Sequence, residues 1–230
     1  MFTYWTFPDT ALPRHAPTKG FQKRNYLEST NREKREAEDF TQMLFYFHQG
    51  DAEALANNLD LSDHRAVLDV GGGSGVMSIA LVNKNPHLSA CILDIAPVCE
   101  IAAKNVKRAR LSRRIRTLVG DIRQSLPRGF DVAPFCDIGA VAMRHLRNAY
   151  QSLPAKGLLV LADRYLTDDG TKPLDRLVEY FVGSSFGRAT CRDMVQAVKS
   201  CGFKAVRARK ACRDLWFITG TKPDRHTGVA

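Results

Sequence analysis

Short apolar runs alternate with longer amphipathic stretches along most of the chain. The runs are bounded by turn-forming residues, which is typical of buried strands. The stretches between them repeat apolar residues every three or four positions, as helices do. This alternation predicts a doubly wound α/β sheet. The predicted strands span residues 66–70, 89–93, 116–119, 130–135, 158–162, 204–209 and 215–221.

Helices are expected before the first strand and in most of the connections. Thr30 and Glu33 have the spacing of a capping box, and they open a helix that we expect to end at Gly50. Glycine at that point would stop the helix because it disfavours helical backbone. Further helices are expected near Met77 and over residues 51–59, 97–110, 144–153, 174–181 and 190–202.

The first predicted strand leads directly into the run Gly71-Gly72-Gly73-Ser74-Gly75. Glycine has no Cβ atom, so this loop can turn sharply and approach a ligand closely. The helix that follows offers unpaired N–H groups and the positive end of its dipole. A dinucleotide fingerprint would need a third glycine at position 76, which is Val76. The loop therefore predicts a cofactor cradle of another kind at the carboxyl end of this strand.

Two further predicted strands end in a carboxylate. Asp94 follows strand 89–93, and Asp121 follows strand 116–119 after a glycine. A carboxylate about 20 residues beyond a glycine loop is placed to accept hydrogen bonds from ribose hydroxyls. The carboxyl ends of parallel strands meet at one edge of a sheet. The three motifs together therefore indicate a site for a nucleoside-containing cofactor.

These motifs resemble those of class I S-adenosylmethionine (SAM) methyltransferases, and more narrowly the small-molecule O-methyltransferase family of plant and bacterial secondary metabolism. The resemblance covers roughly residues 40–222. It implies a Rossmann-like, doubly wound, seven-stranded sheet with a short helical N-terminal extension. The matching stretches are Leu68–Gly75, Leu93–Val98, Gly120-Asp121, Leu153–Val160, Thr167–Thr171 and Cys201–Phe203.

The resemblance also suggests a division of the chain. Residues 1–60 would form an N-terminal arm and helices that border the substrate pocket, residues 61–222 the SAM-binding catalytic domain, and residues 223–230 a tail. Members of the family usually carry a longer N-terminal helical domain for dimerisation, for which this chain lacks the length. A homodimer is therefore compatible with the resemblance but is not required by it.

By the same resemblance, the glycine loop lies against the methionine end of SAM. Asp94, at the end of the second strand, binds the ribose, and Asp121, after the third strand, binds the adenine. These roles suit carboxylates, because hydroxyl and amino groups both need an acceptor. The alternatives are a turn-forming strand end for Asp94 and a helix cap for Asp121. The residues assigned to SAM, or to its product S-adenosyl-L-homocysteine, are Asp69, Gly71, Gly73, Gly75, Asp94, Ile95, Asp121, Ile122 and Cys136.

The sequence departs from the family at the expected catalytic base. Most members place a His-Asp pair just past the fourth strand, where this chain reads Phe135-Cys136-Asp137-Ile138-Gly139-Ala140. Three residues are candidates to replace that histidine. His48 ends the helix that borders the pocket, Asp137 lies at the end of the fourth strand, and His145 lies downstream on a helix. For His145 the alternative is a helix-packing role, and for Asp137 it is positioning SAM.

The methyl acceptor is expected to contact apolar residues from two helices. Phe40, Met43 and Phe47 follow one helical stripe, which either packs in the core or borders the acceptor pocket. Leu177 and Phe181 lie on one face of the helix expected over residues 174–181. A small aromatic or polyketide-like metabolite would suit such a lining.

The chain has 34 Lys and Arg against 24 Asp and Glu, a net charge of +10. Much of the excess lies between Lys104 and Arg116. This stretch is either a phosphate-binding surface for nucleic acid or a solvated helix and loop. We favour the second interpretation, because no aromatic residue interleaves with these charges to stack on bases. Nucleic acid is therefore disfavoured as a partner.

No apolar run approaches the roughly 18 residues that a membrane span needs. The N-terminus also lacks the apolar core of a signal peptide, so we expect a cytoplasmic protein. The six cysteines are scattered without a C-x-x-C pair, which argues against a metal site and against a disulfide framework.

Methylation of a small metabolite at oxygen or carbon is the leading hypothesis for the function. Three alternatives remain open. Some members of the family use bound SAM for hydroxylation or decarboxylation, and a chain without the usual histidine could be of that kind. A degenerate relative could bind SAM without catalysis. An RNA methyltransferase is disfavoured, because no N/D-P-P-Y/F motif follows the fourth strand.

Overall fold

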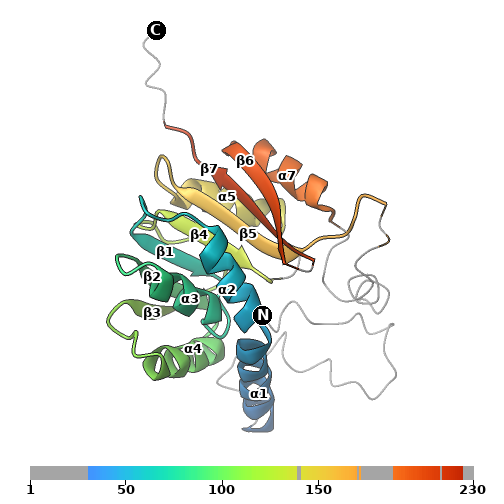
Figure 1. Ribbon diagram of the computed structural model, residues 1–230. Coiled ribbons are helices and arrows are strands. Elements are labelled where there is room, and N and C mark those ends of the chain that lie inside the picture. Colours follow the sequence, from blue (N-terminus) through green and yellow to red (C-terminus); the bar gives the residue numbers. More distant parts are fainter. Residues whose placement is uncertain (1–30, 139–140, 170, 172–188, 213, 225–230) are drawn as a thin grey trace.

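The structure is a computed structural model, and it describes residues 31–138, 141–169, 171, 189–212 and 214–224. Within this part of the chain, seven strands form one sheet in the order β3-β2-β1-β4-β5-β7-β6 (Figure 1). The first five strands run parallel, and β7 is antiparallel to both β5 and β6. The strands are β1 Ala66–Val70, β2 Ser89–Asp94, β3 Ile115–Val119, β4 Val132–Cys136, β5 Leu158–Arg164, β6 Lys204–Cys212 and β7 Leu215–Thr221.

Helices cover both faces of the sheet, and alternate residues of each strand face one layer or the other. Val67 packs in the core with α2, α3 and α4, whereas Leu68 packs in the core with α5 and α7. This is the period-2 alternation that a strand covered on both faces produces. The helices are α1 Asn31–Phe47, α2 Gln49–Asn58, α3 Val76–Lys84, α4 Ala96–Arg108, α5 Met143–Ser152 and α7 Cys191–Ser200.

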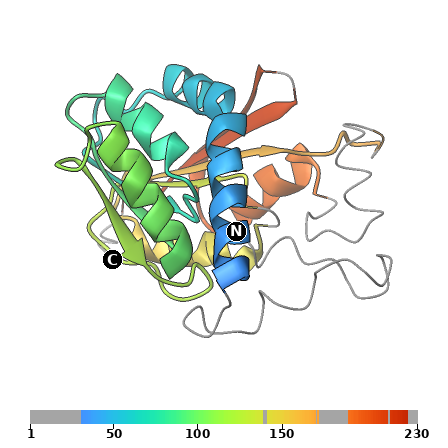
Figure 2. The same ribbon diagram turned by 90° about the horizontal axis from the view of Figure 1, so that it is seen from below.

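The strand order changes direction at β1, which pairs with β2 on one side and with β4 on the other. Chain connections leave β1 and β4 in opposite directions across the sheet, and such a switch point is where α/β sheets bind ligands. Helix α1 stands beside α4 at the lower edge of the sheet in Figure 1 and beside it again in the view of Figure 2. The α1–α2 junction lies near the ends of β4 and β5.

The predicted fold class is confirmed, including the seven-stranded sheet, and most boundaries agree to within two residues. The expected end of the first helix at Gly50 is wrong. Helix α1 ends at Phe47, and Gly50 lies inside α2, where a Cβ atom would meet no neighbour within 4 Å. The helix expected over residues 174–181 lies outside the described residues. None of the described helices is long and apolar enough to cross a membrane.

Candidate functional site

The loop after β1 adopts a backbone that only glycine accepts easily. Gly71, Gly73 and Gly75 have φ of 68°, 56° and 82°, in the left-handed region. The Gly71 N–H donates to the Leu93 carbonyl at 2.8 Å, which ties the loop to β2. A Cβ atom on Gly71 would lie 2.9 Å from Cγ2 of Ile138. The loop therefore lies tight between β2 and the segment after β4.

Asp69 lies directly beneath this loop. Its side chain is fully buried, and Ser78 Oγ donates a 2.7 Å hydrogen bond to Oδ2. A Cβ atom on Gly72 would lie 2.6 Å from the carboxyl carbon. Burial raises the pKa of Asp69, the Ser78 hydrogen bond opposes this and the nearby Asp94 adds to it, and the resulting pKa is about 6. The other oxygen, Oδ1, has no hydrogen-bond partner among the described residues.

Asp94 ends β2, and its carboxylate is held by backbone N–H groups. The Gly73 nitrogen lies 2.9 Å from Oδ2, and the Ile95 nitrogen lies 2.8 Å from Oδ1. The residue is almost completely buried. Asp94 thus links the glycine loop to the start of α4. These bonds fix the orientation of the carboxylate before any ligand arrives.

The Asp121 carboxylate is paired with the side chain of Arg123, whereas that of Asp94 is held by backbone N–H groups. The Arg123 Nε lies 2.9 Å from each carboxylate oxygen, and Nη2 lies 2.6 Å from Oδ2. These hydrogen bonds hold the pKa of Asp121 below its usual value. Asp121 also accepts the Arg123 backbone N–H and so starts a turn, which means that the alternative of a helix cap is wrong. An adenine amino group would have to share this carboxylate with Arg123. The Ile122 side chain is buried next to Gly71.

Cys136 is the last residue of β4, and Asp137 is the first residue of the segment that follows it. Cys136 is buried in the core on the α2–α4 face, and burial raises the pKa of its thiol well above the usual value, with nearby carboxylates adding to this. A cofactor at this position would meet its backbone rather than its sulfur. Asp137 has φ of 48° and is not a glycine, a strained conformation that is common at functional sites.

His48 connects the α1–α2 junction to this segment. Its Nε2 lies 2.9 Å from Oδ2 of Asp137, and its Nδ1 lies 3.0 Å from Oδ2 of Asp51. The same Asp51 oxygen accepts a 2.8 Å hydrogen bond from Nη2 of Arg164 at the end of β5. We call the four residues Asp137, His48, Asp51 and Arg164 the ion-pair chain. It joins α1, α2, β4 and β5 at the edge where the glycine loop lies.

The charges of the ion-pair chain stabilise one another. Burial alone would lower the pKa of His48, but the carboxylates of Asp137 and Asp51, each within 3.0 Å of a ring nitrogen, outweigh it and raise the pKa to about 9. Burial would likewise raise the pKa of Asp51, but His48 and Arg164 hold it below its usual value. In this arrangement His48 carries its proton at neutral pH and is not available as a base.

His145, the third catalytic candidate, lies at the start of α5. It is 1% exposed, and its Nδ1 accepts the Ala142 N–H at 3.1 Å. Burial and the neighbouring Arg144 lower its pKa. This is the helix-packing role that the sequence left open as an alternative.

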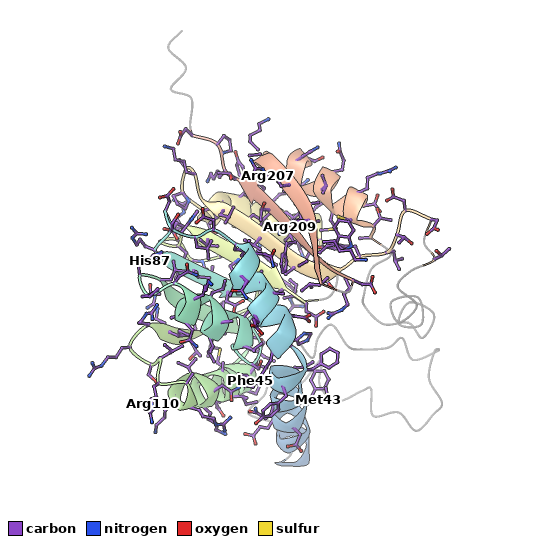
Figure 3. All side chains as sticks on the ribbon, viewed as in Figure 1. Met43, Phe45, His87, Arg110, Arg207 and Arg209 are labelled. Carbon is purple, nitrogen blue, oxygen red and sulfur yellow. The ribbon has the colours of Figure 1, made fainter. Side chains whose placement is uncertain are left out.

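The apolar stripe of α1 divides into a buried and an exposed part. Leu44 packs in the core, but Met43 is 52% exposed and Phe47 is 69% exposed, so the core interpretation is wrong for those two. Figure 3 shows Met43 on the side of α1 away from α4, whereas Phe45 lies on the side toward it. The Phe47 ring meets the His48 ring edge to face, with centroids 5.0 Å apart. Phe40 is half-buried, and Leu177 and Phe181 lie outside the described residues.

Several of the basic residues between 104 and 116 are used within the fold. The Arg114 guanidinium donates to the carbonyls of Val82, Asn85 and Leu88. Lys104 pairs with Glu38 on α1. These contacts reduce the charge that this surface could offer to phosphates, which favours the solvated-helix interpretation.

Three residues of the site were missed at the level of sequence. Ser78 gave no signal, because a serine in the first turn of a helix is common. Arg123 stands two residues after Asp121, where only a turn brings the two side chains together. Asp51 could have been found, because residues three apart on a helix are neighbours and His48 precedes it by three.

The comparisons with known proteins agree on one family. A family profile described as "O-methyltransferase domain" matches residues 17–184. A 3-hydroxy-5-methyl-1-naphthoate 3-O-methyltransferase of Streptomyces sahachiroi is 32% identical over 179 residues, which is 74% of this chain and 51% of that protein. An aclacinomycin 10-hydroxylase of Streptomyces purpurascens is 32% identical over 154 residues, 62% of this chain and 40% of that protein.

The solved structures show the same fold. The crystal structure of the S-adenosylmethionine-dependent methyltransferase SibL in its apo form aligns with a TM-score of 0.67 and 26% identity. That alignment covers 77% of this chain and 56% of SibL. The chain thus spans about half the length of the relatives that it matches.

Proposed function

The chain belongs to the O-methyltransferase family, and on that premise we propose that it transfers the methyl group of SAM to an oxygen or carbon atom of a small aromatic or polyketide-like metabolite. The observation that carries this proposal is the pairing of the left-handed glycine loop with Asp94 at the switch point of the sheet. When bound, SAM supplies an electrophilic methyl group on a positively charged sulfur.

The residues of the loop fit this cofactor. The Gly71–Gly75 backbone would lie along its methionine end, and the oriented Asp94 carboxylate would accept the ribose hydroxyls. Asp69 Oδ1 is a buried oxygen that meets no hydrogen-bond donor in the described part of the chain, and a cationic ligand nearby would stabilise it. Asp121 would accept the adenine amino group alongside Arg123. Acidic groups outnumber basic ones around Cys136, which suits a cofactor with a sulfonium charge.

The acceptor would lie against the exposed apolar face of α1, which presents Met43, Phe47 and part of Phe40. An aromatic ring packs well on such side chains. The naphthoate substrate in the name of one relative is of this size and shape.

The test is calorimetric titration with SAM and with S-adenosyl-L-homocysteine, followed by incubation of methyl-labelled SAM with naphthols, hydroxynaphthoates and simpler phenols. We expect binding of both nucleosides and transfer of label to at least one hydroxylated aromatic. Failure of both nucleosides to bind would overturn the proposal. Binding without transfer to any acceptor would favour the SAM-binding protein without catalysis.

A second candidate function is SAM-dependent hydroxylation or decarboxylation. Two observations favour it: the segment 137–144 directly after β4 contains no histidine, and one relative is named a hydroxylase. Mass spectrometry of the product separates the candidates, because methylation adds a methylene to the mass whereas hydroxylation adds one oxygen atom. A product with added oxygen and no transferred label would replace the leading proposal.

A further inference from the structure

The ion-pair chain gathers four charged side chains at the carboxyl ends of β4 and β5. Asp137 follows β4 directly, and its N–H donates to the Ala162 carbonyl of β5 at 2.9 Å. Its left-handed backbone, with φ of 48°, is less favourable than ordinary backbone for a residue with a side chain. Such strain persists only where surrounding contacts hold it, and His48 supplies one of them.

We propose that Asp137 faces the hydroxyl group of the methyl acceptor and accepts its proton, and that His48 is a positioning residue that holds Asp137 in place. This inference rests on the proposed function and narrows it, because it selects oxygen rather than carbon as the methylated atom.

Two contacts place Asp137 between the cofactor cradle and the acceptor surface. The next residue, Ile138, packs on Gly71 of the glycine loop. On the other side, the His48 ring touches both Asp137 and the exposed Phe47 ring. The His48 ring thus lies between Phe47 and Asp137. The proposal requires that an aromatic acceptor packed on Phe47 extends past this ring, so that its hydroxyl meets the Asp137 carboxylate.

The geometry assigns the proton to Asp137 rather than to His48. Both nitrogens of His48 lie within 3.0 Å of a carboxylate oxygen, so the imidazole is a doubly paired cation. Its pKa of about 9 keeps it protonated at neutral pH. A carboxylate is a weaker base than imidazole, but it acts as a general base when it is correctly placed.

The step balances without a further reactant. The acceptor oxygen forms a bond to the methyl carbon as the carbon–sulfur bond breaks, and the electron pair of that bond stays on sulfur. The acceptor proton moves to the Asp137 carboxylate. It then passes to solvent, since 13% of the Asp137 side chain is exposed.

The pH dependence of this step involves every titratable group around Asp137 and His48. These groups are Asp51 on α2, Asp163 and Arg164 on β5, Cys136 on β4 and Asp69 on β1. As pH rises through about 9, His48 loses its proton and its attraction for Asp137. The rate of methyl transfer should therefore fall above that pH. A His48→Gln variant has no imidazole to lose its proton, so its rate should not show this fall.

The first experiment uses para-nitrophenol, whose ionised form absorbs in the visible, and needs no SAM. Bound next to the Asp137 carboxylate, the phenol should ionise at higher pH than it does free in solution, because a neighbouring anion disfavours the phenolate. Asp137→Asn should lower the ionisation pH of the bound probe below the wild-type value. Asp63→Asn, on an exposed turn, is the matched control and should leave it unchanged. A bound probe that responds equally to both variants, or no binding by wild type, would overturn the proposal.

The second experiment measures kcat for the best phenol found with labelled SAM. Asp137→Asn should lower kcat by about 100-fold or more, the usual range for loss of a general base, and leave S-adenosyl-L-homocysteine affinity within about twofold. His48→Gln should lower kcat less and abolish its fall near pH 9. If the wild-type protein does not bind S-adenosyl-L-homocysteine, the proposed function is wrong. If Asp137→Asn keeps the wild-type kcat, the assignment of Asp137 as proton acceptor is wrong, whereas the proposed function stands.

Discussion

The two halves of the carboxyl edge of the sheet hold their acidic groups in different ways. Beside β1 and β2, Asp94 is held by the backbone N–H groups of Gly73 and Ile95. Beside β4 and β5, Asp137 is held by His48, and Asp51 by Arg164, which is 113 residues away. Backbone donors arise wherever the loop folds, whereas the ion-pair chain exists only when His48 and Asp51 meet Asp137 and Arg164 from two distant segments.

This difference has an energetic consequence. Loss of one partner from a buried ion pair leaves an uncompensated charge, which costs more than the pair contributes. The glycine loop has no such dependence on charge, but it depends on backbone conformations that other residues resist. We therefore expect bulky substitutions to disrupt the glycine loop, and changes of pH to disrupt the ion-pair chain.

The largest effect is expected from Gly73→Val. Gly73 has φ of 56°, which a β-branched residue avoids, and its N–H donates to Asp94. SAM binding should fall below detection by calorimetry while the far-ultraviolet circular dichroism stays native. Gly50→Val is the control, because a Cβ atom there meets nothing within 4 Å. Normal SAM affinity in Gly73→Val would show that the loop is not the cradle.

The next effect concerns His48 and pH. Its pKa in the folded protein, about 9, lies above the ordinary value of 6.5, so its stabilisation is complete below pH 6.5 and is lost as pH rises through 9. A shift of this size corresponds to about 3 kcal/mol at most. Urea unfolding of wild type across this range should show the decline, and His48→Gln should flatten it. His87→Gln should keep the wild-type slope, and an equal slope in His48→Gln would argue against the ion-pair chain.

Asp94→Ala is expected to weaken SAM binding by roughly 1.5–3 kcal/mol, the value of a hydrogen bond to a charged group. Part of this loss comes from the Gly73 N–H, which loses the acceptor that orients it. Calorimetry measures it, with Asp63→Ala as the control. Unchanged affinity would mean that the ribose does not lie at the end of β2.

The smallest effect is expected at Asp69. Burial raises its pKa to about 6, so the carboxyl group is protonated below that pH and anionic above it. A cationic ligand favours the anion, so SAM should bind more tightly as pH rises through 6, by about tenfold or less. Titration at several pH values tests this. Asp69→Asn should remove the trend, and a trend that persists in that variant must come from another group.

The sequence predicts the first half of the edge and misses most of the second. Gly71 and Asp94 belong to one continuous strand–loop–helix–strand unit. The order of its elements alone therefore predicts that the loop and the carboxylate lie close together. His48 and Asp137 were each named as candidates, but their contact depends on how α1 packs on the sheet. The stripe containing Met43 and Phe47 shows the same limit. Periodicity identifies the face of a helix, whereas neighbouring elements decide how much of that face is covered.

Strand β6 forms one end of the sheet, and its sequence bears on how the protein behaves at high concentration. It carries Lys204, Arg207, Arg209 and Lys210, all exposed. Figure 3 labels Arg207 and Arg209 on this strand. Its pairing with β7 is interrupted by two register shifts. Within the described residues no further strand pairs with it. Like charges and an irregular backbone discourage the edge strand of a second copy from adding to the sheet. Part of the net positive charge of the chain thus protects it against aggregation.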